Sequence, residues 1–196
     1  MLATLAQVDY SERMRRVVAM LDNGHIQDAL AETHFNAGEV DRGEAVVLRS
    51  FHAIAYILKG EPLLGLRIAT EVRVTTLEPE LVMFRAEADH ALLFALQALD
   101  EHARAIELAV ECERFGHDHA AQELVARSLR AQGVSLSVLG QHEAAIQKLQ
   151  SAILLFETYS PYIARTLHAK YLLLNAVSRA ISDASKTVRC PICKKV

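Results

Sequence analysis

Residues 139–146 read LGQHEAAI, and related stretches occur three times earlier in the chain. These are NGHIQDAL at 23–30, KGEPLLGL at 59–66 and LDEHARAI at 99–106. In each stretch a turn-forming residue is followed five residues later by a small residue and then by an aliphatic one. The small residues, at positions 29, 65, 105 and 145, are 36, 40 and 40 residues apart. A repeat of this length, with one turn between two apolar-periodic segments, is typical of a solenoid of helical hairpins. The sequence therefore predicts an all-α, right-handed α-solenoid.

Composition supports a helical chain and excludes several classes of function. Hydrophobic residues make up 52% of the 196 residues, with only 8 Gly, 4 Pro and no Trp, which suits long helices with short turns better than a β-sandwich. A net charge of −3 provides no basic surface for nucleic acid. The first ten residues lack the basic start of a secretory signal, and the apolar stretch 91–99 is too short to span a membrane. Three cysteines make no disulfide framework, so we expect a cytoplasmic protein without a membrane or nucleic-acid partner.

Local signals divide residues 1–183 into four hairpin units and a capping helix. Ser11 and Asp41 are expected to cap helices, and Pro62 suits the first turn of another helix. Gly116 is expected to end a helix in the left-handed conformation, and Asp118 to cap the next helix. Residues 184–196, rich in Ser, Lys, Arg and Cys, are expected to form a flexible tail. The expected units are about 10–38, 41–75, 79–116 and 118–159, with the capping helix at 161–182.

The small residues of the fourth unit, Gly133, Ala145 and Ala152, resemble the pattern of the tetratricopeptide repeat (TPR) family. In that family two small residues let the helices of a hairpin approach closely, and a third packs one hairpin on the next. Ala53 and Gly65 fill the first two of these places in the second unit. The resemblance covers about residues 10–182, with a period of 40 residues in place of about 34. It implies about four TPR-like hairpins followed by a capping helix.

The resemblance also implies a binding surface, because TPR proteins bind partner segments in a concave groove lined by the first helix of each hairpin. The groove should be apolar toward the N-terminus and basic toward the C-terminus. Two arginines one turn apart can hold a carboxylate or phosphate; the alternative is that they form an ordinary solvated surface. Val134 stands where chaperone-binding members have asparagine, so their carboxylate clamp is not expected. The predicted groove residues are Ile54, His90, Phe94, Gln97, Arg127, Arg130, Val134 and Lys170.

No phosphate-binding loop, nucleophile elbow or HExxH motif occurs in the sequence, so we do not expect an enzyme. The predicted function is a non-enzymatic protein–protein interaction module, an adaptor or scaffold that binds a protein or peptide partner. The alternative is a ligand-sensing regulatory domain of a bacterial signalling protein whose output domain lies outside this chain. A homodimer is compatible with either function.

The C-terminal Cys190-Pro191-Ile192-Cys193 resembles half of a zinc knuckle. Cys190 and Cys193 can supply two of the four ligands that a closed zinc site needs, and a second chain could supply the others. The alternative is a reduced tail without metal. No other cofactor is expected.

Overall fold

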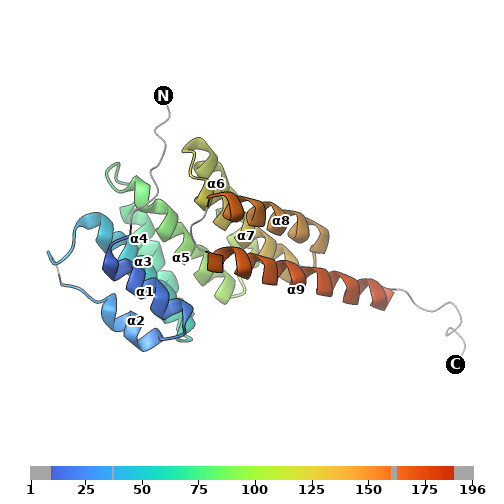
Figure 1. The fold of residues 1–196 in the computed structure, drawn as a ribbon, viewed down its shortest axis with the longest axis horizontal. Coiled ribbons are helices and arrows are strands. Elements are labelled where there is room, and N and C mark those ends of the chain that lie inside the picture. The colour runs from blue at the N-terminus through green and yellow to red at the C-terminus, as the bar shows by residue number, and fades with distance from the viewer. Residues whose placement is uncertain (1–9, 37, 160–162, 188–196) are drawn as a thin grey trace, which may run out of the picture.

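The computed structural model describes residues 10–36, 38–159 and 163–187, and every regular element in these ranges is a helix. The predicted all-α fold is therefore confirmed. The elements are α1 (Glu12–Asp22), α2 (Ile26–Glu32), α3 (Arg42–Leu58), α4 (Pro62–Thr75), the 3₁₀ helix η1 (Val82–Phe84), α5 (Arg85–Ala98), α6 (His102–Asp118), α7 (Gln122–Val138), α8 (His142–Tyr159) and α9 (Ile163–Thr187). Helices α1 to α8 follow one another as contacting neighbours, and the long α9 lies against α8 and α7 (Figure 1).

Several helix ends form as the sequence predicts. The Ser11 hydroxyl accepts a hydrogen bond from the Met14 N–H at 3.3 Å, and the Asp41 carboxylate accepts one from the Glu44 N–H at 2.9 Å. Pro62 is the first residue of α4. The repeated turns contain a residue in the left-handed region, with φ of +94° at Gly60. The repeated stretches are therefore the points at which the chain reverses.

Small residues let paired helices approach closely, as the resemblance implied. A Cβ atom on Gly65 would lie 2.8 Å from the carbonyl oxygen of Ala53 on the facing helix α3. A Cβ atom on Gly133 would lie 2.6 Å from Leu149 Cγ and 3.2 Å from the carbonyl oxygen of Ala145, both on α8. Contacts this short leave no room for a side chain, so glycine at these positions sets the distance between the two helices of each pair.

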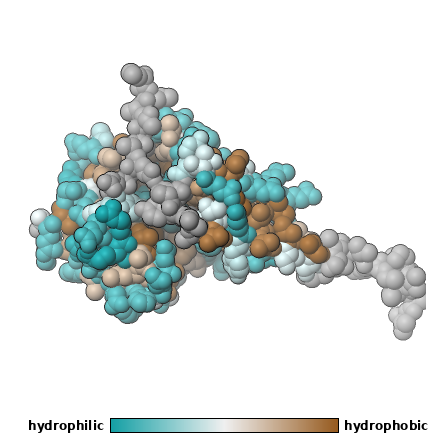
Figure 2. Space-filling view, viewed as in Figure 1, coloured by the Kyte–Doolittle hydropathy of each residue, from teal (hydrophilic) through white to brown (hydrophobic). Residues whose placement is uncertain are grey.

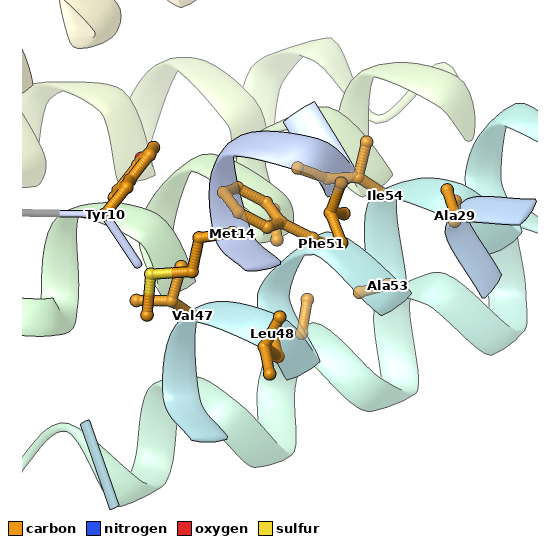
Figure 3. Close-up of a cluster of buried hydrophobic side chains, with 12 residues drawn as sticks. Tyr10, Met14, Ala29, Val47, Leu48, Phe51, Ala53 and Ile54 are labelled. Carbon is orange, nitrogen blue, oxygen red and sulfur yellow. The ribbon is translucent and has the colours of Figure 1, made fainter. Parts of the chain in front are cut away.

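A cluster of buried side chains holds α1, α2 and α3 together and reaches α4 and α5 (Figure 3). Met14 from α1 and Val47, Leu48 and Phe51 from α3 are buried in it. The Tyr10 ring meets the Phe51 ring edge-on, with ring centroids 5.8 Å apart. This cluster fixes α1 against the rest of the array even though its helical partner α2 has only seven residues.

The junction between α6 and α7 differs from the prediction. Helix α6 continues through Gly116 to Asp118, and the left-handed residue is Ala120, with φ of +53°. Gly116 is needed for packing, because a Cβ atom there would lie 2.7 Å from a methyl carbon of Val125 on α7. The predictions that Gly116 ends a helix and that Asp118 caps the next one are therefore wrong.

Two other helix ends also differ from the prediction. The first helix of the third unit begins at Arg85, preceded by η1, although the unit was expected to begin at about residue 79. Helix α9 continues past residue 183 to Thr187.

The outer face of α9 is apolar. Leu167, Leu174 and Ile181 are spaced at seven residues and are 60%, 69% and 65% exposed. Figure 2 shows apolar surface gathered over α8 and α9. Among the described residues, no helix combines the length and the hydropathy needed to cross a membrane.

Candidate functional site

A hollow of about 360 Å³ lies where the first helices of the repeats meet α9. One helix of each pair contributes to it: α1, α3, α5 and α7. Helix α9 closes one side. The lining side chains are Val18, Leu21, Asp22, Phe51, Ile54, Glu87, His90, Phe94, Arg130 and His168.

The repeat period brings equivalent positions into this hollow. Ile54 on α3 and Phe94 on α5 are 40 residues apart, and so are His90 on α5 and Arg130 on α7. Because stacked repeats present the same helix face in the same direction, side chains one period apart lie beside each other. The hollow is therefore built by the repeat itself.

Most of the wall is apolar. Val18 and Leu21 come from α1, and Phe51 and Ile54 from α3. Phe51 and Ile54 also belong to the buried cluster of Figure 3, so their backbones are held by the core. On α5 the rings of His90 and Phe94 stand 6.5 Å apart, tilted to one another. The wall thus offers a firm apolar surface to an aliphatic or aromatic group.

The carboxylate of Glu87, also in the wall, is held by two neighbours. The Tyr10 hydroxyl donates to one oxygen at 2.5 Å, and Arg127 Nη1 donates to the other at 2.8 Å. Arg127 also donates to Glu123 at 2.8 Å. Burial by itself would lower the pKa of Arg127, but Glu87 and Tyr10 outweigh it and raise the pKa above the ordinary value. Glu87 and Arg127 therefore form a buried ion pair inside the array, and Arg127 is shared with Glu123.

Arg130 has no such partner. In the part of the chain that the structure describes, no carboxylate forms a salt bridge with its guanidinium, and its one hydrogen-bond contact is with His168 Nδ1 at 3.5 Å. Burial, and then the positive charge of Arg127, lower the pKa of Arg130 to about 10. Burial and the charge of Arg130 likewise lower the pKa of His168, while Asp22 acts in the opposite direction. The hollow thus contains the cation of Arg130 beside an imidazole whose pKa is lowered.

The structure brings four of the eight predicted groove residues together in this hollow: Ile54, His90, Phe94 and Arg130. The other four lie elsewhere, for reasons that the contacts explain. Arg127 is already held in ion pairs with Glu87 and Glu123, so of the two arginines expected to hold an anion only Arg130 lines the hollow. Gln97 donates to the Ala131 carbonyl oxygen at 2.9 Å, between α5 and α7.

The remaining two predicted residues also fall outside the hollow. Lys170 Nζ lies 2.6 Å from a Glu157 carboxylate oxygen, in an ion pair between α9 and α8. Val134 is partly buried on α7 and does not line the hollow. Neither residue therefore contributes to the wall.

Sequence reasoning missed the contributions of α1, Phe51 and His168. The first unit matches the repeat pattern least well, so its groove positions could not be carried over. The spacing of Phe51 indicates a core residue, and Phe51 is indeed buried in the core as well as lining the hollow. The position of His168 depends on how α9 is rotated, and nothing in the repeat pattern fixes that rotation.

The predicted zinc ligands Cys190 and Cys193 lie outside the described residues. Among the residues that are described, no group of three or more His, Cys, Asp or Glu side chains is arranged to hold a metal ion. Cys112 is buried in α6, and burial raises the pKa of its thiol far above the ordinary value. A thiol in this state is a poor nucleophile and a poor metal ligand.

A similar arrangement of helices occurs in another protein of known structure. The apo form of RapI is similar to this fold. The TM-score is 0.65 at 14% sequence identity, and the alignment covers 87% of this chain and 63% of RapI. RapI is a helical-repeat solenoid, so the likeness supports a helical-repeat solenoid here too. No protein family matches the sequence, and no curated protein shows significant sequence similarity to it.

Proposed function

We propose that this chain is a protein–protein interaction module, without catalytic activity of its own, that holds a segment of a partner protein in the groove lined by α1, α3, α5, α7 and α9. The observation that carries the proposal is the hollow itself, because one helix of every pair contributes a side chain to it. A concave, largely apolar surface with a few polar groups is what a partner segment needs for specific docking. The likeness to RapI supports the helical-repeat fold on which the groove depends.

The experiment is site-specific photo-crosslinking in the native host. A photoreactive phenylalanine analogue replaces Phe94, which lines the hollow, and in a matched variant it replaces Leu63, which is 71% exposed on α4. Irradiation followed by mass spectrometry should identify one partner segment joined at position 94 and absent at position 63. Equal capture at the two positions, or capture at position 63 alone, would refute binding in the groove.

The sequence also suggested a ligand-sensing domain, and the size of the hollow favours this as a second candidate. Its volume of about 360 Å³ falls in the range of small-molecule pockets. In that case no protein is crosslinked at position 94, and a metabolite raises the unfolding temperature of the wild-type protein. The same metabolite should have less effect on the Phe94→Lys variant.

A further inference from the structure

Arg130 is the feature of the hollow that most needs an explanation. Arg130 is partly buried, its side chain lines the hollow beside apolar side chains of α1, α3 and α5, and among the described residues it has no carboxylate partner. Arg127, three residues earlier on the same helix, has two. A cation removed from water is costly unless an anion or several hydrogen-bond acceptors offset the loss of solvation. An anion brought by a ligand would provide that offset.

The charges around the hollow indicate which anion fits. Glu87 and Asp22 line the same space, and Glu87 is paired with Arg127, which also pairs with Glu123. A dianion such as a phosphate monoester would bring a second negative charge toward these carboxylates, and among the described residues that line the hollow no second arginine or lysine is present to balance it. A carboxylate carries a single charge and matches the planar guanidinium with two parallel hydrogen bonds. The balance of charge therefore favours a carboxylate.

The apolar wall indicates what the carboxylate is attached to. Val18, Leu21 and Phe94 face the same hollow as Arg130. We propose that this hollow binds an acidic side chain of the partner segment together with an adjacent large aliphatic or aromatic side chain, with Arg130 holding the carboxylate and the wall from α1, α3 and α5 holding the apolar group. This inference rests on the proposed function, since it specifies the chemistry of the segment that the groove recognises.

The test uses small probes that separate charge from apolar contact. Wild-type protein with ¹³C-labelled methyl groups is titrated with 3-phenylpropionate, with its neutral amide 3-phenylpropionamide, and with phenyl phosphate. The acid should shift the methyl signals of Val18, Leu21 and Ile54 in a saturable manner and bind about tenfold more tightly than the amide. Phenyl phosphate should bind no more tightly than the acid.

Variants assign this preference to Arg130. Arg130→Gln should bind acid and amide equally, whereas Arg130→Lys should keep part of the preference. Arg67→Gln, which removes an exposed arginine on α4, should behave as the wild type. Equal binding of acid and amide by the wild type would overturn the inference, as would a preference that survives in Arg130→Gln. Tighter binding of phenyl phosphate would overturn it in favour of a phosphate site.

The probe titration and the crosslinking experiment can fail separately. Crosslinking of a partner at position 94 without a preference for the acid would leave the proposed function intact and remove the inference. A preference for the acid without any crosslinked protein would remove the proposed function and assign the site to a small carboxylic acid.

Discussion

Glu87 on α5 and Arg127 on α7 form an ion pair of 2.8 Å, in which each side chain is only 6% exposed. The two residues are 40 residues apart and so occupy the same position in successive repeats. Tyr10, before α1, donates to the same Glu87 carboxylate. Glu87 therefore connects α5 to α7 and to the residue before α1, at the wall of the candidate groove. Arg130 is left as the arginine of α7 that lines the hollow.

Breaking this ion pair should destabilise the protein strongly. Glu87→Gln leaves the buried Arg127 without one of its two carboxylates, and removing one partner of a buried pair costs about 3–5 kcal/mol. Urea denaturation followed by circular dichroism measures this loss. The double variant Glu87→Leu/Arg127→Met replaces both charges by apolar groups and should recover most of the stability. A Glu87→Gln protein within about 1 kcal/mol of the wild type would contradict the assigned burial.

Gly65→Ala should also be destabilising, although alanine is the better helix former by about 1 kcal/mol. The new Cβ would lie 2.8 Å from the Ala53 carbonyl oxygen, a backbone atom that cannot move without moving α3. Overpacking of this kind costs about 1–3 kcal/mol, which exceeds the gain in helix propensity. The control is Thr70→Ala on the exposed face of the same helix, where a smaller change in the free energy of unfolding is expected. A more stable Gly65→Ala protein would show that α3 and α4 are not in such close contact.

Protonation of His52 should lower the free energy of unfolding as the pH falls. Burial, and then the positive charges of His34 and Arg49, lower the pKa of His52 from 6.5, and its Nδ1 lies 2.7 Å from the Thr33 hydroxyl. Between the lowered pKa and 6.5 the unfolded chain binds more protons than the folded one, so this group's contribution to stability decreases through that window. Denaturation of wild type and His52→Gln at pH 7.5 and 5.5 checks this. The wild type should lose more stability than the variant, and equal losses would contradict the prediction.

Binding of 3-phenylpropionate should tighten as the pH falls from 8 to 6. The pKa of His168 is lowered by burial and by Arg130, while Asp22 opposes this. Glu87 and His90 also face the hollow. A bound carboxylate near Arg130 favours the charged imidazole, so binding is accompanied by proton uptake. Methyl signals recorded at both pH values give the two affinities, and His168→Gln should show a smaller difference between them. An affinity for the wild type that does not depend on pH would place the carboxylate away from His168.

The sequence predicted the repeated elements well because their signals are local. Ser11, Asp41 and Pro62 act through hydrogen bonds or ring geometry within one turn of helix, and a spacing of 40 residues is visible without any structure. Gly116 shows the limit of such signals. A glycine near a helix end indicates a left-handed turn, but here the close approach of Val125 from the next helix requires it, and that neighbour is known only once the helices are stacked.

The candidate site was only partly predictable for the same reason. Ile54, Phe94, His90 and Arg130 follow from the period. Arg127 matches the pattern equally well, yet its role depends on Glu87 and Glu123, which neutralise it. His168 depends on the rotation of α9, which packing against α8 and α7 determines. Side chains whose partners lie on other helices thus cannot be assigned from spacing alone.

The position shared by Glu87 and Arg127 also bears on how the hairpins assemble in the right order. On α3 the same position, one period before Glu87, is Val47, which is fully buried. A misfolded chain in which α7 stacked directly on α3 would place Arg127 against Val47 in place of Glu87, leaving only Glu123 of its own helix as a partner, at a cost of a few kcal/mol. Repeats with near-identical packing surfaces are prone to such skipped or swapped arrangements. The Glu87–Arg127 pair therefore favours the packing of α7 on α5 over the packing of α7 on α3.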